Sequence, residues 1–483
     1  MRSTSSLAPV VISTHISHLF FVGDRVYKVK RPVSFPFLDL STASKRRDDC
    51  EREVRLNRRL APDVYLGVGR FIGPETDEPV VVMRRLPTDR RLSRLVGTAA
   101  AGDAVRTVAH RLAAFHTTTE SSVTIDEGGS QRAIRERWIA NLSETQRFVG
   151  GPLTAKRHAM IRDLALRYVE GRDALFSSRI AQGRIRDAHG DLLADDIFCL
   201  DDGPRILDCL EFDDRLRHID GIEDCASLAT DLERLGRPDL ADRFVADYKE
   251  FTNDRPPPSL FHHYAAYRAL VRAKVACIRE EQVDPDARRE ARLLFASCEN
   301  HLTRAGVHLV LIGGLPGTGK TTVANALGEG REWAVLSTDR IRKELTGAPL
   351  QATEHGFRAG IYAPHVTAAT YGEMLRRAAR ILSMGGSVIL DATWSDGNLR
   401  TRARELAART SSDLSEFRCT VPLQRAVARI ASRSTDPTNL SDATVEVARR
   451  MAAAFAPWPE AITIDTTESV GARPDLALTV TGR

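Results

Sequence analysis

The feature that most constrains this chain is the glycine-rich loop GLPGTGKT at residues 314–321. The apolar run 308–313 before it is typical of a buried parallel strand, and residues 322–327 after it are typical of the start of a helix. Backbone N–H groups of such a loop and the helix N-terminus surround a phosphate, the lysine reaches the β- and γ-phosphates, and the threonine hydroxyl helps to hold Mg²⁺. The sequence therefore predicts a binding site for a nucleoside triphosphate with Mg²⁺. Its predicted nucleotide-binding residues are Gly314, Leu315, Pro316, Gly317, Thr318, Gly319, Lys320, Thr321 and Thr322, of which Thr321 is also a predicted metal ligand.

The position of this loop predicts more than one domain. The loop begins at residue 314 of 483, and a loop of this kind usually follows the first strand of its own domain. Single hydrophobic cores stop growing at about 250–300 residues, so the preceding part of the chain needs a core of its own. A boundary between a charged helix and the strand at 308–313 gives two expected domains, residues 1–303 and 304–483.

Composition narrows the class of protein. With 42% hydrophobic and 28% charged residues, the chain has the composition of an ordinary soluble globular protein. No apolar run approaches the roughly 20 residues of a membrane span, and the N-terminus lacks the apolar segment of a signal peptide. Seven cysteines without paired spacing favour buried thiols in a reducing cytosol. The net charge of +5 is mild and the basic runs alternate with acids, so we expect a cytoplasmic protein with neither nucleic acid nor membrane as partner. The oligomeric state stays open.

A second group of chemically active residues precedes the loop by more than a hundred residues. His189-Gly190-Asp191 is followed by two apolar runs, 197–200 and 205–212, which flank a turn at 201–204 and so predict a hairpin. Such a hairpin would bring Asp191, Asp196 and Asp208 together at its open end. Gathered carboxylates need a neutralising cation, for which Mg²⁺ with phosphate oxygens is the usual solution. The alternative is a set of exposed loop acids.

The His-Gly-Asp triplet, its spacing to Asp196 and the hairpin before Asp208 resemble the aminoglycoside phosphotransferase family, a branch of the protein-kinase-like fold. The resemblance implies that Asp191 orients or deprotonates the acceptor hydroxyl and that Asp208 holds magnesium. The family has an asparagine as its other metal ligand, five residues after the aspartate, where this chain has Asp196. This carboxylate can ligate Mg²⁺, but it adds negative charge beside the phosphates and could tune or impair transfer. Residues 192–195 also lack the His and Gly often found there.

The N-terminal segment fits a kinase-like lobe. Residues 16–22 and 25–30 predict two strands joined by a tight Gly23-Asp24 turn. Lys28 and Lys30 share one face of the second strand, and a kinase-like lobe needs one such lysine at the α- and β-phosphates. We predict Lys28, with Lys30 or a merely solvated face as alternatives. A predicted helix over 44–60 turns Glu53 inward as the partner of this lysine. The exit from a strand at 79–83 is then the hinge that meets the adenine.

The run from 26 to about 279 resembles a bacterial group of bifunctional proteins in which an aminoglycoside-phosphotransferase-like domain precedes a P-loop ATP-binding domain. Domain order is the most specific element of this resemblance. It implies an α+β protein-kinase-like domain followed by an α/β P-loop kinase domain with a parallel sheet.

Acidic residues after two predicted strands of the second half suggest a kinase. Asp339 follows a strand at 333–338 and would face the γ-phosphate, placed to orient an acceptor hydroxyl. The tract resembles P-loop kinases of the polynucleotide kinase, gluconate kinase and zeta-toxin group, where an Arg near Arg342 contacts the acceptor. The alternative role of Asp339 is a helix N-cap. Asp391 ends the strand at 386–391 and is a candidate for binding magnesium or substrate. Ala392 stands where a motor ATPase usually has a glutamate, which favours transfer over hydrolysis.

Three arginines spaced by four residues lie on one face of a predicted helix, at 425, 429 and 433. They could close a lid over the phosphates, or they could form a solvated stripe. Of the three, Arg429 and Arg433 are the predicted nucleotide contacts.

Together these patterns predict a bifunctional, ATP- and Mg²⁺-dependent kinase that transfers the γ-phosphate to hydroxyl groups of small molecules whose identity the sequence does not reveal. Two alternatives stay open. In one, only the P-loop domain transfers phosphate and the first domain is an ATP-binding regulator. In the other, the chain is a nucleotide-sensing interaction protein without turnover.

Overall fold

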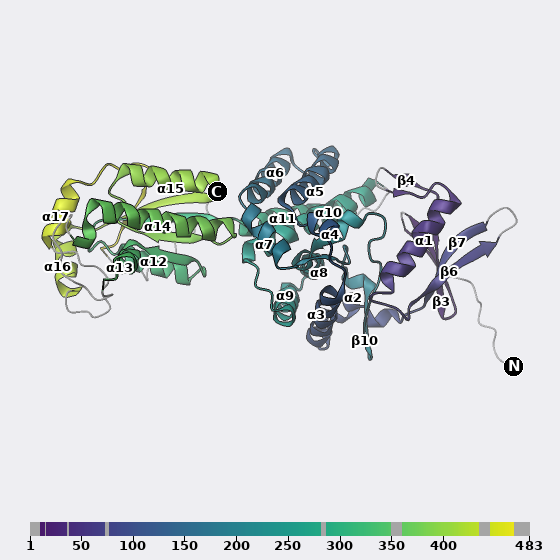
Figure 1. Cartoon of the computed structure of the whole chain (residues 1–483). Coiled ribbons are helices and arrows are strands. Elements are labelled where there is room, and N and C mark those ends of the chain that lie inside the picture. The colour runs from purple at the N-terminus through teal and green to yellow at the C-terminus, as the bar shows by residue number, and fades with distance from the viewer. Residues whose placement is uncertain are drawn as a thin grey trace. The chain divides into compact units, whose positions relative to one another are not determined.

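The computed structural model describes residues 10–14, 16–35, 38–72, 77–281, 286–348, 360–433 and 445–467 (Figure 1). The chain divides into two compact units. The first comprises Met1–Arg162, Phe176–Pro256 and Phe261–Leu302, and the second comprises Asp163–Leu175, Pro257–Leu260 and Thr303–Arg483. Because the second unit includes two short segments of the earlier half, the simple limits 1–303 and 304–483 stay a prediction.

The first unit begins with an antiparallel sheet of five strands in the order β1-β2-β3-β7-β6. Burial alternates along its central strand, with Val26, Lys28 and Lys30 on the buried face. The strands are β1 (Val10–Ser13), β2 (Ser17–Val22), β3 (Arg25–Lys30), β6 (Tyr65–Ile72) and β7 (Asp77–Arg84).

Helix α1 (Ala43–Asn57) packs on this sheet and follows the short hairpin of β4 (Ser34–Phe35) and β5 (Leu38–Asp39). Thr42 is its N-cap, and the Thr42 hydroxyl accepts a hydrogen bond from the Lys45 amide. The buried face of α1 carries Cys50 and Val54, which join the core of the sheet, and also several charged residues. A helix that buries charge must offer partners for it, so this face marks a possible site.

The remainder of the first unit is mainly helical, with two small antiparallel pairs of strands. The helices are α2 (Leu92–Leu95), α3 (Ala101–Thr118), α4 (Val123–Glu127), α5 (Gln131–Thr145), α6 (Ala155–Glu170), α7 (Asp173–Ala181), α8 (Gly221–Arg234), α9 (Pro238–Thr252), α10 (Pro258–Glu281) and α11 (Ala287–Arg304). Of these, residues 163–170 of α6, 173–175 of α7, 258–260 of α10 and 303–304 of α11 belong to the second unit.

The predicted hairpin forms, but it is shorter than expected. Strand β9 (Ile197–Leu200) pairs with β10 (Gly203–Ile206), so the turn has two residues, and β10 ends where residues 207–212 were also expected to be extended. The second pair, β8 (Ile185–Asp187) with β11 (His218–Asp220), flanks the His-Gly-Asp segment. The two pairs thus place the His-Gly-Asp segment and the residues after β10 next to each other.

The second unit contains a parallel sheet of five strands in the order β13-β14-β12-β15-β16. Its central strand, β12, immediately precedes the glycine-rich loop, and its interior residues are fully buried. The strands are β12 (His308–Gly313), β13 (Ala334–Ser337), β14 (Val388–Asp391), β15 (Asp413–Thr420) and β16 (Ile462–Asp465).

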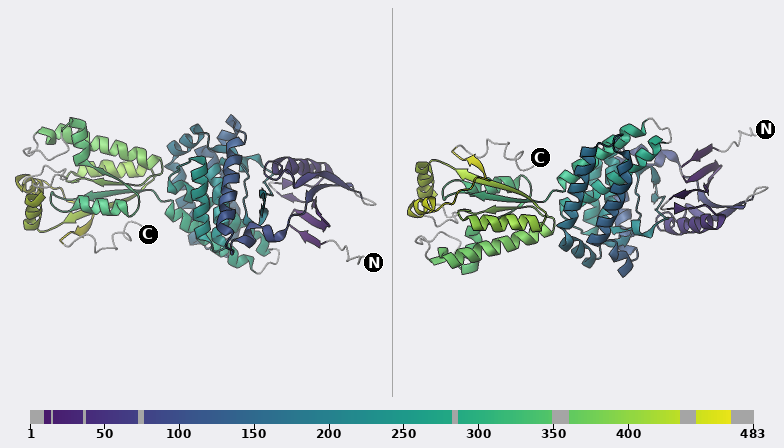
Figure 2. Two further views of the ribbon diagram at one scale, coloured as in Figure 1. Left: turned by 90° about the horizontal axis from the view of Figure 1, so that it is seen from below. Right: turned by 90° about the horizontal axis from the view of Figure 1, so that it is seen from above.

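Helices flank this sheet (Figure 2) and cover its apolar strands. The parallel strands and crossover helices confirm the predicted α/β class. Among the described residues of the whole chain, no helix combines the length and the apolar character that crossing a membrane requires. The helices of this unit are α12 (Lys320–Glu329), α13 (Thr338–Thr346), α14 (Pro364–Ser383), α15 (Gly397–Arg409), α16 (Leu423–Arg433) and α17 (Val445–Ala453).

Candidate active sites

In the first unit, Lys28 lies between two carboxylates. Its Nζ donates to Oε1 of Glu53 at 2.9 Å and to Oδ1 of Asp208 at 2.8 Å. The predicted partner of the strand lysine is therefore in place, on the buried face of α1. Burial opposes the charge of Lys28, but Asp208 and Glu53 together outweigh it, and the pKa of the ammonium lies well above its usual value. Lys28 is thus a fixed cation at the point where strand, helix and hairpin meet.

Asp208 has an unusual backbone conformation. Its φ is 63°, in the left-handed region that a non-glycine residue rarely adopts. The Asp208 amide donates to Oη of Tyr65 at 3.3 Å, and the next amide, of Cys209, donates to Oδ1 of Asn57 at 2.9 Å. The charge of Lys28 holds the pKa of the Asp208 carboxyl below its usual value. Strain of this kind is typical of functional sites.

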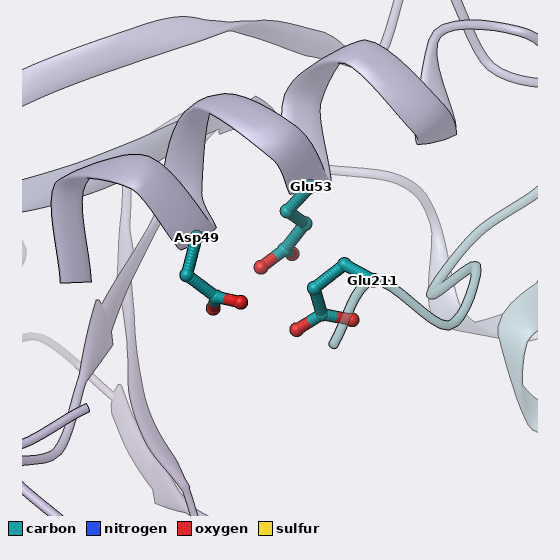
Figure 3. A group of neighbouring side chains, drawn as sticks. All are labelled: Asp49, Glu53 and Glu211. Atoms are coloured by element: carbon teal, nitrogen blue, oxygen red, sulfur yellow. The ribbon is translucent and has the colours of Figure 1, made fainter. Parts of the chain in front are cut away.

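Lys30 is enclosed by a second set of carboxylates. Ligand oxygens of Asp49, Glu53 and Glu211 lie within 4.8 Å of one another, the spacing of a metal site (Figure 3). However, Nζ of Lys30 lies 2.8 Å, 2.6 Å and 2.6 Å from these three residues, and its side chain is completely buried. Its Nζ donates to Oε1 of Glu211, and its contacts with Asp49 and Glu53 are buried ion pairs. The lysine therefore takes the place of a metal ion, and the geometry favours Lys28 over Lys30 as the lysine that meets phosphates.

The His-Gly-Asp segment is held through its backbone. Carboxylate oxygens of Asp224, on α8, accept from the amides of His189 at 3.0 Å and Gly190 at 2.9 Å. Arg268, on α10, donates to the Gly190 carbonyl and pairs with Glu223 at 2.9 Å. Sequence patterns gave no role to Asp224, Glu223 or Arg268, because their partners are backbone groups and each other, which carry no sequence signal. Two helices thus fix the segment that ends in Asp191.

Asp191 itself is partly exposed, and its nearest described cation is Arg272, with Nη1 at 3.9 Å from Oδ2. Its carboxylate interacts with that of Asp196, whose pKa is raised well above its usual value by burial and then by the charges of Asp208 and Asp191. Asp196 is also joined to the hairpin exit, because its carbonyl accepts from the Leu207 amide at 2.9 Å. The three carboxylates therefore share one electrostatic environment.

They do not, however, converge as closely as the sequence predicted. Among the described residues, the three-carboxylate group with ion-sized spacing is the one around Lys30, and Asp191, Asp196 and Asp208 do not form another. The reason is that β10 ends early and the strained turn at Asp208 directs its carboxylate to Lys28. Two carboxylates remain for an ion, Asp196 and Asp208. They fit Mg²⁺, since oxygen ligands suit it and the charge of Asp208 adds to burial in raising the pKa of Asp196.

Asp196→Asn is expected to make ATP binding by the first unit less steeply dependent on Mg²⁺. With the carboxylate, like charges repel the nucleotide until a cation binds, and the extra charge then tightens the cation. Titrating Mg²⁺ at fixed ATP, in full-length chains that carry Lys320→Ala to silence the second site, measures this. Transfer activity is expected to rise or to stay nearly unchanged. Superimposable Mg²⁺ curves would place Asp196 outside the metal site.

The same substitution has a pH signature without any ligand. A carboxyl whose pKa is raised by folding destabilises the folded state where it is ionised, so Asn is expected to raise the denaturation midpoint at pH 7–8. The gain should disappear as the pH falls below the ordinary carboxyl pKa of about 4, because both states are then protonated.

In the second unit, the glycine-rich loop needs its glycines. Gly314, Gly317 and Gly319 have φ values of 143°, 80° and 81°. A Cβ on Gly317 would lie 2.5 Å from the Ala426 carbonyl oxygen, and one on Gly314 would lie 2.6 Å from that of Cys419. Helix α12 then begins at Lys320, so backbone N–H groups and the helix N-terminus face the same point.

The predicted metal residues of this loop meet directly. Oγ1 of Thr321 donates to Oδ2 of Asp391, the last residue of β14, at 2.8 Å. Burial raises the pKa of Asp391 although the charge of Lys320 lowers it. Oδ1 of Asp391 is buried and has no hydrogen-bond partner within the described parts of the chain. A hydroxyl and a carboxylate with an unpartnered buried oxygen fit a Mg²⁺ ion.

Asp339 is not a helix N-cap. Helix α13 begins at Thr338 with Ser337 as its cap, and Asp339 lies in the first turn. Its Oδ1 accepts from Nη1 of Arg342 at 2.7 Å, and its charge contributes to the raised pKa of Asp391. The guanidinium of Arg342 also lies over the ring of Tyr362, 4.4 Å from the centroid. The structure thus brings together the carboxylate and the arginine for which a role at the acceptor was predicted.

Of the predicted lid arginines, Arg429 adjoins the phosphate loop. Its Nη2 donates to the Thr466 carbonyl at 2.7 Å, and Oγ1 of Thr466 donates to the Thr318 carbonyl at 2.6 Å. Arg425 donates instead to the Thr467 carbonyl at 2.6 Å. Arg433 ends α16, and its side chain lies outside the described part of the chain. Thr466, which links helix and loop, had no sequence signal.

These two folds and their sites define a class of protein, a fusion of an aminoglycoside-phosphotransferase-like domain with a P-loop kinase-like domain. The chain belongs to a bacterial family of such fusions. It is 42% identical over 461 residues to the uncharacterized protein Rv2004c of Mycobacterium tuberculosis, which covers 94% of this chain and 92% of that protein. The uncharacterized protein Mb2027c of Mycobacterium bovis matches with the same sequence identity, and the match covers the same fractions of the two chains. A family model described as AAA domain matches residues 309–458.

Solved structures resemble one or the other part of the chain. The GDP and kanamycin complex of APH(2")-IIia is 17% identical, covers 62% of this chain and 95% of its own, and has a TM-score of 0.40. A choline/ethanolamine kinase family protein from Mesorhizobium loti is 13% identical, and the match covers 62% of this chain and 92% of that protein with a TM-score of 0.37. A gluconokinase from Sinorhizobium meliloti is 16% identical, and the match covers 36% of this chain and 91% of that protein with a TM-score of 0.27.

Proposed function

We propose that this protein is a bifunctional, ATP- and Mg²⁺-dependent phosphotransferase of the cytoplasm, in which each domain transfers the γ-phosphate of ATP to a hydroxyl group of a small molecule. The observation that carries the proposal is the same combination in both domains. Each has a lysine suited to phosphate, a carboxylate suited to a metal ion, and a separate carboxylate suited to an acceptor hydroxyl.

In the first domain, Lys28 binds the α- and β-phosphates, and its pairing with Glu53 keeps its ammonium charged and in place. Asp208 and Asp196 hold Mg²⁺, which neutralises the phosphate oxygens when it is bound. Asp191 accepts the proton of the acceptor hydroxyl, and the bonds from Asp224 to the preceding backbone keep it in position. Lys28 contacts Asp208 directly. When MgATP binds, the lysine therefore pairs with phosphate oxygens and the aspartate with the metal ion, at adjacent positions.

In the second domain, residues 314–322 bind the triphosphate, with Lys320 at the β- and γ-phosphates and Arg429 closing the loop from α16. Thr321 and Asp391 hold Mg²⁺. Asp339 orients the acceptor hydroxyl and Arg342 contacts the acceptor. These assignments give every buried charge of the site a task in phosphate transfer.

Asp191→Asn is expected to reduce phosphate transfer by the first domain by about 10²–10⁴-fold while ATP affinity changes less than about twofold. The carboxylate acts on the acceptor hydroxyl and not on the nucleotide, so transfer and binding should separate. ATP consumption is measured in full-length Lys320→Ala chains against sugars, aminoglycosides, nucleosides and peptides. Asp195→Asn is the matched control, because Asp195 is an exposed acid of the same loop whose neighbour is Ser93. Unchanged transfer would remove Asp191 from the mechanism.

A second candidate function is an ATP-binding, regulatory first domain. The specific observation in its favour is Asp196, a carboxylate whose negative charge adds to that of Asp208 and Asp191 and repels the phosphates. MgATP binding by the first domain without transfer to any acceptor, in the chain with Lys320→Ala, would support this alternative.

A further inference from the structure

Arg272 is a cation without a task in the interactions described so far. It lies on α10, its side chain is 22% exposed, and its Nη1 is 3.9 Å from Oδ2 of Asp191. That distance allows charge attraction but exceeds a hydrogen bond. Within the described residues, no hydrogen bond to the Arg272 guanidinium is found. Because the side chain is partly exposed, its N–H donors are accessible to a bound molecule.

The charged groups around Arg272, by contrast, form close ion pairs and hydrogen bonds within the protein. Arg268, one turn earlier on α10, is held by Glu223 and the Gly190 carbonyl. Glu223 also pairs with Arg137 at 3.1 Å and is completely buried. Lys274, on the other side, donates to Glu144 and Asn141. Unlike these neighbours, Arg272 and Asp191 form no hydrogen bond through their charged groups within the described residues, so a molecule that approaches can bind both.

We propose that the acceptor of the first domain carries an anionic group, a carboxylate or a phosphate, within a few bonds of the hydroxyl that is phosphorylated, and that Arg272 binds this group. This inference rests on the proposed function of Asp191. A hydroxyl within about 2.6–3.2 Å of the Asp191 carboxylate lies beside the guanidinium. Arginine binds carboxylates and phosphates through two parallel N–H bonds, and its planar donors are well suited to such a neighbour.

The transfer step places this anion apart from the reacting bond. The acceptor hydroxyl gives its proton to Asp191, its oxygen forms a bond to the γ-phosphorus, and the bond from that phosphorus to the β–γ bridging oxygen breaks, which releases ADP. Arg272 takes no part in these changes and is a specificity-determining residue. A cationic acceptor would meet its like charge and leave the guanidinium without a partner, so the arrangement selects against it.

Four acceptors on one three-carbon skeleton test the proposal: glycerol, 3-amino-1,2-propanediol, glycerate and glycerol 3-phosphate. A second set on a six-carbon skeleton tests larger acceptors: glucose, glucosamine, gluconate and glucose 6-phosphate. Transfer from ATP, and calorimetric binding in the presence of MgADP, are measured with the full-length chain carrying Lys320→Ala. We expect the anionic members of a set to bind and to accept phosphate in preference to the neutral and cationic ones.

Arg272→Gln is expected to raise the KM for anionic acceptors roughly 10- to 100-fold and to change kcat only a few-fold. Arg272→Lys should have an intermediate KM. Arg215→Gln is the matched control, because Arg215 is 87% exposed and pairs with Asp213. Equal use of neutral or cationic acceptors, or anion binding that is indifferent to Arg272→Gln, would overturn the proposal, as would the absence of any anion binding. Arg272-dependent anion binding without transfer would instead uphold the anion site and contradict the proposed function.

Discussion

Lys320→Ala is expected to abolish one of two MgATP-binding events in the full-length chain. Lys320 begins α12 and supplies a side-chain cation to phosphates that otherwise meet backbone N–H groups. Losing a charged hydrogen bond to phosphate costs about 1.5–3 kcal/mol, so binding at this site should weaken by about 10- to 150-fold. Calorimetric stoichiometry, two sites in the parent and one in the variant, measures the effect.

Lys156→Ala is the control for this experiment, since Lys156 is an exposed lysine of α6. It should retain both binding events with unchanged affinities. Undiminished binding at both sites in Lys320→Ala would show that the glycine-rich loop is not a triphosphate site. A parent chain with a single site that Lys320→Ala removes would instead contradict nucleotide binding by the first domain.

Lys30→Met is expected to destabilise the first domain by about 3–5 kcal/mol, because it leaves three buried carboxylates without their shared cation. At neutral pH the full effect should appear. Burial opposes the charge of Lys30, but Glu53 and Glu211 raise its pKa above the unfolded value of about 10.4, so its contribution is complete below that pH and is lost only as the pH rises through the folded value. Hydrogen exchange of the β3 and α1 amides across a urea series reports the unfolding of this domain.

Lys45→Met provides the matched control, because Lys45 forms an exposed pair with Asp39 and should contribute only about 0–1 kcal/mol. Adding Glu211→Gln to Lys30→Met removes one uncompensated charge and should restore part of the stability. MgATP binding should also weaken in Lys30→Met, since Glu211 lies three residues after Asp208 and anchors that segment to β3. A loss no larger than that of Lys45→Met would mean that the cluster around Lys30 is solvated.

Local patterns in the sequence were enough to predict the elements that carry both sites. The alternation along β3, the helical spacing that turns Glu53 inward, and the strand–loop–helix run at residues 308–327 each depend on neighbours within a few positions. Their physical basis is local, because a period of two or of 3.6 residues decides which side chains share a face. The phosphate loop is the extreme case, since its glycines and its lysine are all adjacent in the chain.

The contacts that fix the side chains of the sites could not be predicted from local patterns in the sequence. Lys28 lies 180 residues from Asp208, and Arg268 lies 78 residues from Gly190. The early end of β10 and the left-handed turn at Asp208 decided that this carboxylate meets Lys28 and does not join Asp191 and Asp196 in one ion-sized group. No periodicity encodes such a turn, because its strain is offset by hydrogen bonds from residues elsewhere in the fold.

The sequence by itself determined the two-domain organisation, the fold classes and the identity of the phosphate loop, since these follow from motifs and periodicities of adjacent residues. Only the tertiary structure decided which of two equivalent lysines on β3 is enclosed by three acids and which faces Asp208. It alone placed Asp224 under the His-Gly-Asp backbone and Arg272 beside Asp191. The physical reason is that buried charges are positioned by partners distant in the chain, and the energy of each pair depends on burial and on distances of a few ångströms, which exist only in the folded state.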